Sequence, residues 1–565
     1  MKTLAALLAF ALPLSAMTPP QLHKLATDYY AWRDQTFPVV TSDQGRHTFD
    51  DELADYSQAA VASRRAHVQS IVEKVKTIDI SVWKKDDAID AILFRSQVER
   101  DDFLSRVLRA EETNPQVYVD EASNAIFSIL KKEYAPTDVR ARAAMHRFQK
   151  IPKLIADGKK NLTEPVRLYS ELAIDSARNI DSLFDTVDTL SGPLSSSEKE
   201  ELAHAKDDAK KALHEYADWL EERLKTMKPW KPMGKERYEF MLRHLLLLPF
   251  NAEQVEELGR IELGRYRALE AMLKDPSMAD PDPHRSASIP RDQQEFLDRY
   301  QSREEEMIRF LREQHLVTLP DYLGPFLIRQ LPEAFKPTSP GGFMNPPGIY
   351  DSDPSGFYFI PTYNPNSRNF YIRAAIEDPR PILGHEGIPG HFLQLSIARR
   401  SDNEIRRQHF DSVFIEGWAL YTEEMLTREG LYGADSAAAA QVLRLSRYRA
   451  ARIGVDVNLH TGRWSFDRAV KYFMEGGGLD KEAATGEAAG AATSPTQKIS
   501  YITGKWQIMQ LLGRYRDMRG ASFKLGEFHD ELIAHGSLPV SVLEWIVLDD
   551  PSSLEKATGK KLKLR

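Results

Sequence analysis

The chain has 565 residues, a formal net charge of −8 and no cysteine. Acidic and basic residues are interspersed along it, and it has no basic stretch of the kind that binds nucleic acid, so no nucleic-acid partner is expected. The absence of cysteine excludes disulfides, thiolate metal sites and cysteine nucleophiles, so any metal must be bound through His, Asp and Glu.

The first residues are typical of a secretory signal peptide. Lys2 supplies the basic start, Leu4–Leu12 the apolar core, and small residues end at Ala16, just before Met17. We therefore expect residues 1–16 to be a signal peptide and the mature protein to be periplasmic or extracellular; a buried first helix is the alternative. The apolar run is shorter than the roughly 20 residues that span a bilayer, so no stable membrane insertion is expected. No cysteine at the predicted cleavage point is available for lipid attachment.

Helical patterning dominates the remainder of the chain. From Pro20 to about Met227, apolar residues recur at helical spacing and charged residues fill the other faces. Pro and Gly between positions 229 and 234 interrupt this pattern and divide the chain into an N-terminal helical region (17–228) and a C-terminal helical region (235–565). The two regions together, residues 17–565, are expected to form one unit. Asp275–Pro290 is predicted to be a surface loop.

A segment rich in Pro, Gly, Asn and aromatic residues runs from Pro332 to Pro381. Phe357–Ile360 and Phe370–Ile372 are its predicted strands. The stretch Gly356–Ile360 could be an edge strand that pairs with an extended peptide, or a strand that only packs. Helices return after it, and Ala483–Ala492 is predicted to be a flexible surface loop. The predicted fold is therefore mainly α, a large multi-helical architecture with a small β element just before the most unusual motif.

That motif is GHEGIPGH, from Gly384 to His391. The common zinc-peptidase motif H-E-x-x-H places two histidines one helical turn apart, with a glutamate beside the metal. Here His391 follows His385 by six positions, and six residues of a regular helix turn through about 600°, so the imidazoles would diverge. Pro389 cannot donate a backbone hydrogen bond and Gly390 accepts unusual backbone angles, so we predict a bulge that brings the two imidazoles together.

A third ligand is expected from the helix predicted at Phe410–Met425. Glu416 lies within its apolar stretch, and burying an unpaired carboxylate there would be costly, whereas a divalent cation removes that cost. Glu423 lies two turns further along the same face. It is predicted to orient a ligand histidine by a hydrogen bond, with a solvated acid at the helix end as the alternative.

Two histidines and one carboxylate leave one coordination position open, which is the pattern of catalytic zinc. We expect one Zn²⁺ per chain, held by His385, His391 and Glu416, and this donor set also accepts manganese, cobalt or nickel. Glu386 is then the expected general base, receiving a proton from water that the ion has acidified. Two ordinary core histidines are the alternative interpretation.

These residues resemble a known family. HEGIPGHFLQ followed by EGWALYTEE closely resembles the DUF885 proteins, a bacterial group similar in pattern to helical zinc peptidases with a glutamate as third ligand. The segments YEFMLRHLLLLPFNAEQVEELGRIELGR, DVNLH and SYITGK extend the resemblance over most of the mature chain. It implies a mostly α-helical, metal-dependent, peptidase-like hydrolase, and it leaves the substrate open.

The resemblance also suggests residues beyond the ligands and the base. In DVNLH, Asp456 and His460 share a helix face, so His460 could stabilise an oxyanion while Asp456 fixes its tautomer; a packed core histidine is the alternative. Tyr501 resembles a tyrosine that related peptidases direct at the oxyanion, with a buried structural tyrosine as the alternative. The run GEAAGAATSPTQ departs from the family pattern, and Thr496 stands where the family carries glycine.

The preferred functional hypothesis is a metallopeptidase that cleaves short peptides. One alternative is a zinc hydrolase of another amide or ester, and another is a non-catalytic exported binding protein with a structural or vestigial metal site. The expected partner is a peptide or small amide substrate. The sequence does not predict an oligomeric state.

Overall fold

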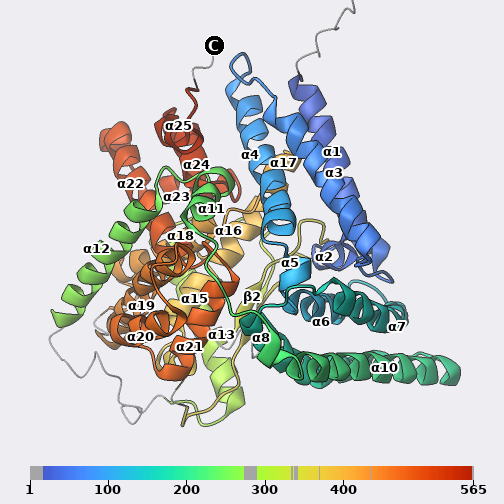
Figure 1. Ribbon diagram of the computed structural model, residues 1–565. Helices are drawn as coiled ribbons and strands as arrows, with labels where there is room; N and C mark the ends of the chain where they lie inside the picture. The colour runs from blue at the N-terminus through green and yellow to red at the C-terminus, as the bar shows by residue number, and fades with distance from the viewer. Residues whose placement is uncertain are drawn as a thin grey trace, which may run out of the picture.

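The computed structural model describes residues 17–272, 289–332, 335, 342–367, 369–433 and 436–562. The predicted signal peptide and nearly all of the predicted loop Asp275–Pro290 lie outside the described residues. The described part is mainly α-helical with one small sheet, as the sequence predicts (Figure 1).

The chain passes through three successive groups of helices. The N-terminal group comprises α1 (Pro19–Thr36), α2 (Pro38–Asp43), α3 (Gln58–Lys76), α4 (Lys85–Asp102) and α5 (Ala110–Thr113). The second group comprises α6 (Gln116–Leu130), α7 (Thr137–Asn161), α8 (Arg167–Arg178), α9 (Asp181–Asp185) and α10 (Ser196–Glu221). The third group begins with α11 (Lys235–Phe240), α12 (Ala252–Ala271) and α13 (Gln293–Glu313).

The sheet and the remaining helices complete the C-terminal half. The strands are β1 (Phe326–Gln330), β2 (Phe343–Asn345) and β3 (Gly356–Ile360). The helices are α14 (Phe370–Glu377), α15 (Arg380–Glu386), α16 (His391–Ala398), α17 (Glu404–Gln408), α18 (Ser412–Arg428), α19 (Ser436–His460), α20 (Phe466–Tyr472), α21 (Lys481–Thr493), α22 (Ser500–Arg519), α23 (Leu525–Ala534), α24 (Val540–Leu548) and α25 (Ser552–Thr558).

The sheet has the order β1-β3-β2, with β1 parallel and β2 antiparallel to β3. Every residue of β3 is buried. Phe357 and Phe359 pack against the helices α6–α10, whereas Tyr358 and Ile360 belong to the cluster that includes Ile388 of the GHEGIPGH segment. Because β3 is the central strand and both its edges are paired, Gly356–Ile360 is not the edge strand that one interpretation of the sequence required.

One apolar cluster combines both ends of the chain. It includes Tyr29 and Phe94 from the N-terminal helices together with Trp418 and Trp545 from the C-terminal ones. The largest core is thus built from residues on both sides of the Pro- and Gly-containing stretch 229–234.

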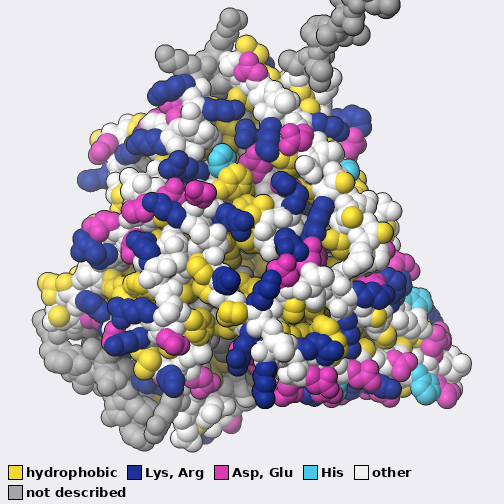
Figure 2. Space-filling view, viewed as in Figure 1, with side chains coloured by type: hydrophobic (Ala, Val, Ile, Leu, Met, Phe, Trp, Pro, Cys, Tyr) yellow, Lys and Arg dark blue, Asp and Glu magenta, His cyan; other side chains and the backbone are white. Residues whose placement is uncertain are grey.

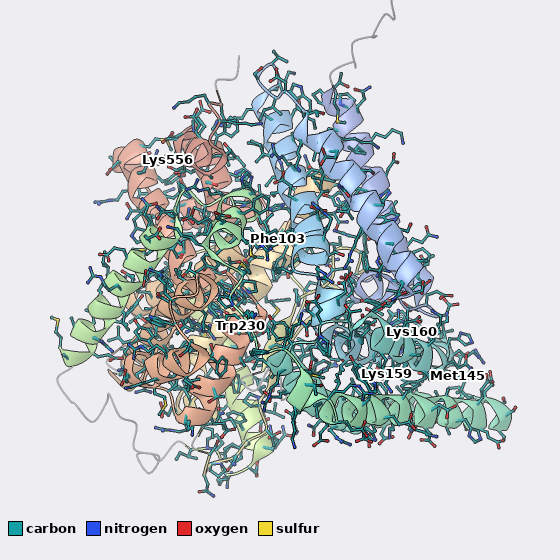
Figure 3. The ribbon with its side chains drawn as sticks, viewed as in Figure 1. Phe103, Met145, Lys159, Lys160, Trp230 and Lys556 are labelled. Carbon is teal, nitrogen blue, oxygen red and sulfur yellow. The ribbon has the colours of Figure 1, made fainter. Side chains whose placement is uncertain are left out.

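Two further contacts cross that stretch. Trp230 donates its indole N–H to the hydroxyl of Tyr169 at 3.2 Å and to the carbonyl oxygen of Ala492 at 3.1 Å. Phe103 stacks on Phe240 with ring centroids 5.5 Å apart. Figure 3 shows Trp230 and Phe103 where the N-terminal helices meet the C-terminal ones.

Two sequence-based predictions of local structure were wrong. Phe370–Ile372, predicted as a strand, begins α14. Asn369 precedes it, and its side-chain oxygen accepts the backbone N–H of Ile372 at 3.4 Å, which is a helix-capping contact. This local cap outweighs the β propensity of the aromatic and β-branched residues.

The predicted loop Ala483–Ala492 is the buried helix α21. Asp480 caps it by accepting the backbone N–H of Ala483 at 2.9 Å. Alanine has the highest helix propensity, and its small side chain lets α21 pack closely against α19 and α20. Composition alone had suggested flexibility because a run of small residues lacks the usual apolar periodicity.

The surface carries charges of both signs. On the face drawn in Figure 2, acidic and basic side chains are interspersed, and apolar side chains gather near the centre. Within the described part of the chain, no helix combines the length and the apolar character needed to cross a membrane.

Candidate metal centre

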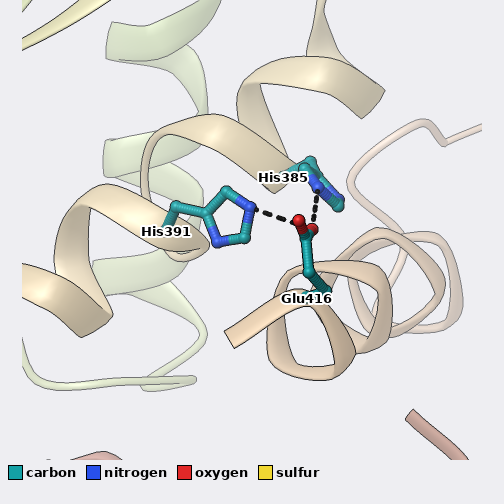
Figure 4. A group of neighbouring side chains, drawn as sticks. All are labelled: His385, His391 and Glu416. Carbon is teal, nitrogen blue, oxygen red and sulfur yellow. Dashed lines mark ion pairs between the residues drawn. The ribbon is translucent and has the colours of Figure 1, made fainter. Parts of the chain in front are cut away.

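The structure brings together the three predicted ligands from three helices of the C-terminal half, α15, α16 and α18. His385 lies at the end of α15, His391 begins α16, and Glu416 lies in the first half of α18. The Nε2 atoms of both histidines point toward the carboxylate of Glu416 (Figure 4). Both imidazoles are buried, and the side chain of Glu416 retains 17% of its exposure. The group is therefore enclosed but reachable from one side.

The histidines converge because the helix is interrupted, not bulged as the sequence analysis predicted. Helix α15 ends at Glu386, a turn containing the cis Ile388–Pro389 peptide bond follows, and α16 starts at His391. A Cβ atom on Gly390 would collide with the backbone carbonyl of His385. Only glycine therefore lets the turn fold back so closely, and the imidazole centroids end up 4.6 Å apart.

Helix α18 holds this turn as well as supplying a ligand. Trp418 donates its indole N–H to the carbonyl oxygen of Pro389 at 2.9 Å, and Thr422 donates its hydroxyl to that of Gly384, also at 2.9 Å. Both residues lie on the same helix as Glu416. The spacing between the third ligand and the two histidines is therefore fixed by direct hydrogen bonds, in addition to apolar packing.

A close crossing with α22 fixes the position of α18. Gly417, next to Glu416, lies against Gly504, and a Cβ atom on either residue would overlap the backbone of the other helix. The two helices consequently meet backbone to backbone. This crossing brings Tyr501, at the start of α22, and Gln497, just before that helix, beside the carboxylate of Glu416.

The distances within the group fit a small divalent ion. Oε2 of Glu416 lies 3.4 Å from Nε2 of His385 and 3.3 Å from Nε2 of His391. Zinc bonds of about 2.0–2.2 Å at tetrahedral angles separate neighbouring donor atoms by about 3.3–3.5 Å. All three ligand atoms lie within 4.8 Å of one another, and no other described group of His, Asp and Glu side chains meets this condition.

The electrostatics of the group also favour a cation. Burial and the nearby Arg449 guanidinium lower the pKa of His385, but the carboxylates of Glu416 and Glu423 outweigh them and raise it to about 9. Burial raises the pKa of Glu416, yet contact with the two imidazoles holds it well below the usual range. Glu416 is thus ionised, and the surroundings of His385 stabilise positive charge.

Glu423 lies on the far side of His385 from Glu416. Its Oε1 atom is 2.8 Å from Nδ1 of His385, and its side chain is completely buried. A carboxylate in this position favours the tautomer that carries its proton on Nδ1, and this leaves the lone pair of Nε2 free to bind a metal. The structure thus places Glu423 where the sequence analysis predicted an orienting acid, and not at a solvated helix end.

Glu386, the predicted general base, is half-buried at the end of α15. Its carboxylate makes no side-chain hydrogen bond to any described residue and so remains available to a substrate or to water. Burial raises the pKa values of Tyr300 and Tyr358, and the Glu386 carboxylate, which lies within electrostatic reach of both rings, adds to this effect.

Tyr501 lies on the other side of the group. Its ring is stacked on His385 with centroids 6.0 Å apart. Gln497 donates to its hydroxyl at 2.9 Å and to Oε1 of Glu416 at 3.4 Å. Burial and the Glu416 carboxylate raise the pKa of Tyr501, while the Arg452 guanidinium, 4.6 Å above its ring, opposes them. The phenol consequently stays protonated and can donate a hydrogen bond.

The structure favours the packed alternative for His460. Its Nε2 lies 2.8 Å from the carbonyl oxygen of Ala491, and its ring stacks on Tyr238. A carbonyl partner requires the proton on Nε2, which is then unavailable to an oxyanion.

Asp456 likewise has other partners. It accepts hydrogen bonds from the backbone N–H groups of Thr496 at 3.1 Å and Lys498 at 2.9 Å and from the Tyr238 hydroxyl at 2.9 Å. It therefore anchors the segment that leads into α22 and so holds Gln497 in place.

The sequence analysis missed Gln497, Arg449 and Arg452. Arg449 contacts Glu423, and Arg452 covers the ring of Tyr501. Their positions depend on how α19 and α22 pack against α18, and no local motif signals that packing. The helical repeat of Arg449, Arg452 and Asp456 on one helix is the only sequence feature that could have suggested it.

The sequence profile described as "Bacterial protein of unknown function (DUF885)" matches residues 38–547, most of the chain and all of the candidate metal centre. The chain belongs to the DUF885 family. In this DUF885 protein, Thr496 adopts φ +70°, a conformation that favours glycine, the residue that the sequence analysis expected here from the family resemblance. No curated protein matches the chain.

Two solved structures share the fold. One is a candidate lipoprotein of unknown function from Shewanella oneidensis, with a TM-score of 0.72 and 22% identity, matching 94% of this chain and 100% of that one. The other is a candidate lipoprotein from Colwellia psychrerythraea, with a TM-score of 0.76 and 18% identity, matching 94% of this chain and 98% of that one. The architecture of this DUF885 protein thus recurs in both proteins over nearly their whole length.

Proposed function

We propose that this DUF885 protein is a metal-dependent hydrolase that cleaves peptides, with His385, His391 and Glu416 holding one zinc or other divalent ion. The observation that carries the proposal is the convergence of three ligand atoms at separations that suit tetrahedral zinc, beside Glu386, whose carboxylate makes no side-chain hydrogen bond to any described residue. A structural zinc site has four protein ligands, whereas three leave a position for the reacting molecules.

A bound divalent ion supplies Lewis acidity, which polarises a carbonyl group and acidifies water. Around it, each residue of the chain has a distinct task. Glu386 accepts the proton of the attacking water and returns it to the leaving group. Tyr501 donates its phenolic proton in a hydrogen bond to the oxygen on which negative charge develops. Gln497 keeps that hydroxyl in position through its own hydrogen bond.

Metal content tests the proposal. Elemental mass spectrometry on the purified mature protein should give close to one zinc per chain, and Glu416→Ala should lose it. Glu429→Ala, an exposed acid at the end of the same helix, is the matched control and should keep the metal. A wild-type protein that holds no metal even after reconstitution with zinc would contradict the hydrolase and favour a binding protein.

The substrate class rests on the resemblance to helical zinc peptidases. Turnover of a peptide library, compared with acyl-amide and ester panels, tests it. Hydrolysis of esters or other amides without peptide turnover would support the metal-dependent hydrolase but contradict peptides as its substrates. A zinc-loaded protein that is inert on all panels would favour the non-catalytic alternative.

We also propose that the protein is exported after removal of residues 1–16. The basic start, apolar core and small residues before Met17 support this location, as does the description of both structural relatives as candidate lipoproteins. N-terminal sequencing of the protein from a periplasmic fraction should begin at Met17. Retention of Met1 in a cytoplasmic fraction would contradict it.

A further inference from the structure

Arg449, on α19, contacts the carboxylate that orients His385. Its two terminal nitrogens reach both oxygens of Glu423: one lies 3.0 Å from Oε1, the other 3.3 Å from Oε2. Oε1 is the same atom that lies 2.8 Å from Nδ1 of His385. Arg449, Glu423 and His385 thus form a continuous chain that joins α19, α18 and α15.

This arrangement is entirely enclosed. The side chain of Glu423 has no exposure, and that of Arg449 has 6%. A buried carboxylate without a cationic partner is strongly unfavourable, and a two-point contact with a guanidinium fixes the plane of the carboxylate as well as its charge. Oε1 is therefore held 2.8 Å from His385 Nδ1, and the imidazole is held with Nε2 facing Glu416.

His391 has no comparable support. No described acid other than Glu416 lies within ion-pair distance of its ring, whereas Glu423 lies 2.8 Å from Nδ1 of His385. The orientation of the ligand pair therefore depends mainly on His385, which makes the arginine behind it important for the geometry of the whole centre.

The charge of Arg449 also affects metal affinity, in the direction opposite to its orienting effect. A guanidinium close to the centre repels a divalent cation, and this Coulomb term alone predicts tighter metal binding when Arg449 is removed. Loss of orientation predicts weaker binding. The direction of the change in affinity consequently separates a positioning role from a purely electrostatic one.

We propose that Arg449 is a positioning residue of the metal centre, which acts through Glu423 to orient His385 for the ion. The proposal rests on the metal-dependent function proposed above. Outer contacts of metal-bound histidines typically contribute 10- to 100-fold in affinity, and we expect a change of about this size here.

The experiment measures zinc affinity by competition with a chromophoric chelator on the full mature protein. Arg449→Met should weaken binding about 10- to 100-fold. Arg449→Lys, which keeps the charge but makes a single-point contact, should have a zinc affinity between those of Arg449→Met and the wild type. Arg444→Met is the matched control: Arg444 is another arginine of α19 with low side-chain exposure, 11%, and it pairs at 2.6 Å with Glu377 of α14, which is not a ligand. It should stay within about threefold of the wild type.

A double-mutant cycle with Glu423→Gln tests whether Arg449 acts through Glu423. In the Glu423→Gln background, Arg449→Met should have little further effect on zinc affinity. The absorption bands of the cobalt-substituted protein should shift in Arg449→Met and not in Arg444→Met, because they report ligand geometry. If Arg449→Met does not fold, as judged by circular dichroism of the metal-free form, the cycle is run with Arg449→Lys.

The outcomes separate the two proposals. Unchanged or tighter zinc binding by Arg449→Met, or an equal loss in the Glu423→Gln background, would overturn the positioning role and leave the metal centre intact. A wild-type protein that binds no ion would overturn both.

Discussion

Two buried histidine–acid groups lie in the C-terminal half, one around His385 and one around His460. His385 faces carboxylates through both ring nitrogens, Glu416 at Nε2 and Glu423 at Nδ1. His460 donates its Nε2–H to the backbone carbonyl of Ala491, and the nearby Asp456 accepts hydrogen bonds from backbone N–H groups. The sequence analysis gave each histidine a role, metal binding to His385 and, as one of two interpretations, oxyanion stabilisation to His460.

The difference lies in what compensates each acid. Backbone N–H groups and a tyrosine hydroxyl donate hydrogen bonds to the carboxylate of Asp456. This carboxylate therefore holds the chain in place. Glu416 and Glu423 depend on imidazoles and one guanidinium, and the centre as a whole attracts a cation. A buried acid whose partners are themselves titratable indicates a ligand site more strongly than the presence of a histidine does.

The largest effect is expected at the general base. Glu386→Gln removes the proton acceptor and keeps the size of the side chain, so kcat should fall by about 10²–10⁴-fold. Because Glu386 is not a ligand, zinc content should stay at the wild-type level. Steady-state kinetics together with elemental analysis test this, and full activity in a zinc-loaded Glu386→Gln protein would refute the assignment.

A smaller loss is expected at the phenol on the opposite side. Tyr501→Phe keeps the ring on His385 but removes the hydrogen-bond donor, so kcat should fall by roughly 10²–10³-fold with little change in KM. Tyr515→Phe, a buried tyrosine on the same helix whose hydroxyl bonds to Glu531, is the control and should keep kcat. Equal kcat values for the two variants would support a merely structural Tyr501.

The smallest effect on kcat is expected in the group around His460. His460→Gln removes the stacking on Tyr238 while keeping a donor for Ala491, so the free energy of unfolding should fall by about 1–2 kcal/mol. The rate should stay within about threefold. Denaturant unfolding and kinetics on the same sample measure both, and a large loss of kcat at unchanged stability would return His460 to the catalytic residues.

The sequence predicts the helical architecture and the three candidate ligands because both depend on local patterns. Apolar spacing identifies the helices, and the Pro-Gly pair between His385 and His391 signals an interruption. The form of that interruption was not predictable, since it depends on hydrogen bonds that Trp418 and Thr422 donate from another helix.

The errors have the same origin. Ala483–Ala492 was predicted as a loop because a run of small residues has no apolar face, but small side chains also suit a helix whose alanine face packs closely against α19 and α20. Arg449 and Gln497 are distant in sequence from the motifs they serve. Only the packing of α19 and α22 against α18 brings them to the centre.

The glycine contact between α18 and α22 has a consequence for mutational surveys of this protein. Gly504 touches neither the ligands nor the base, yet any side chain there would wedge α22 away from Val413 and Gly417. The displacement would move Glu416 and Tyr501 apart, although every functional group would still be present. A screen scored on activity alone would therefore rank Gly504 among the catalytic residues, whereas it acts as the spacer that sets the width of the centre.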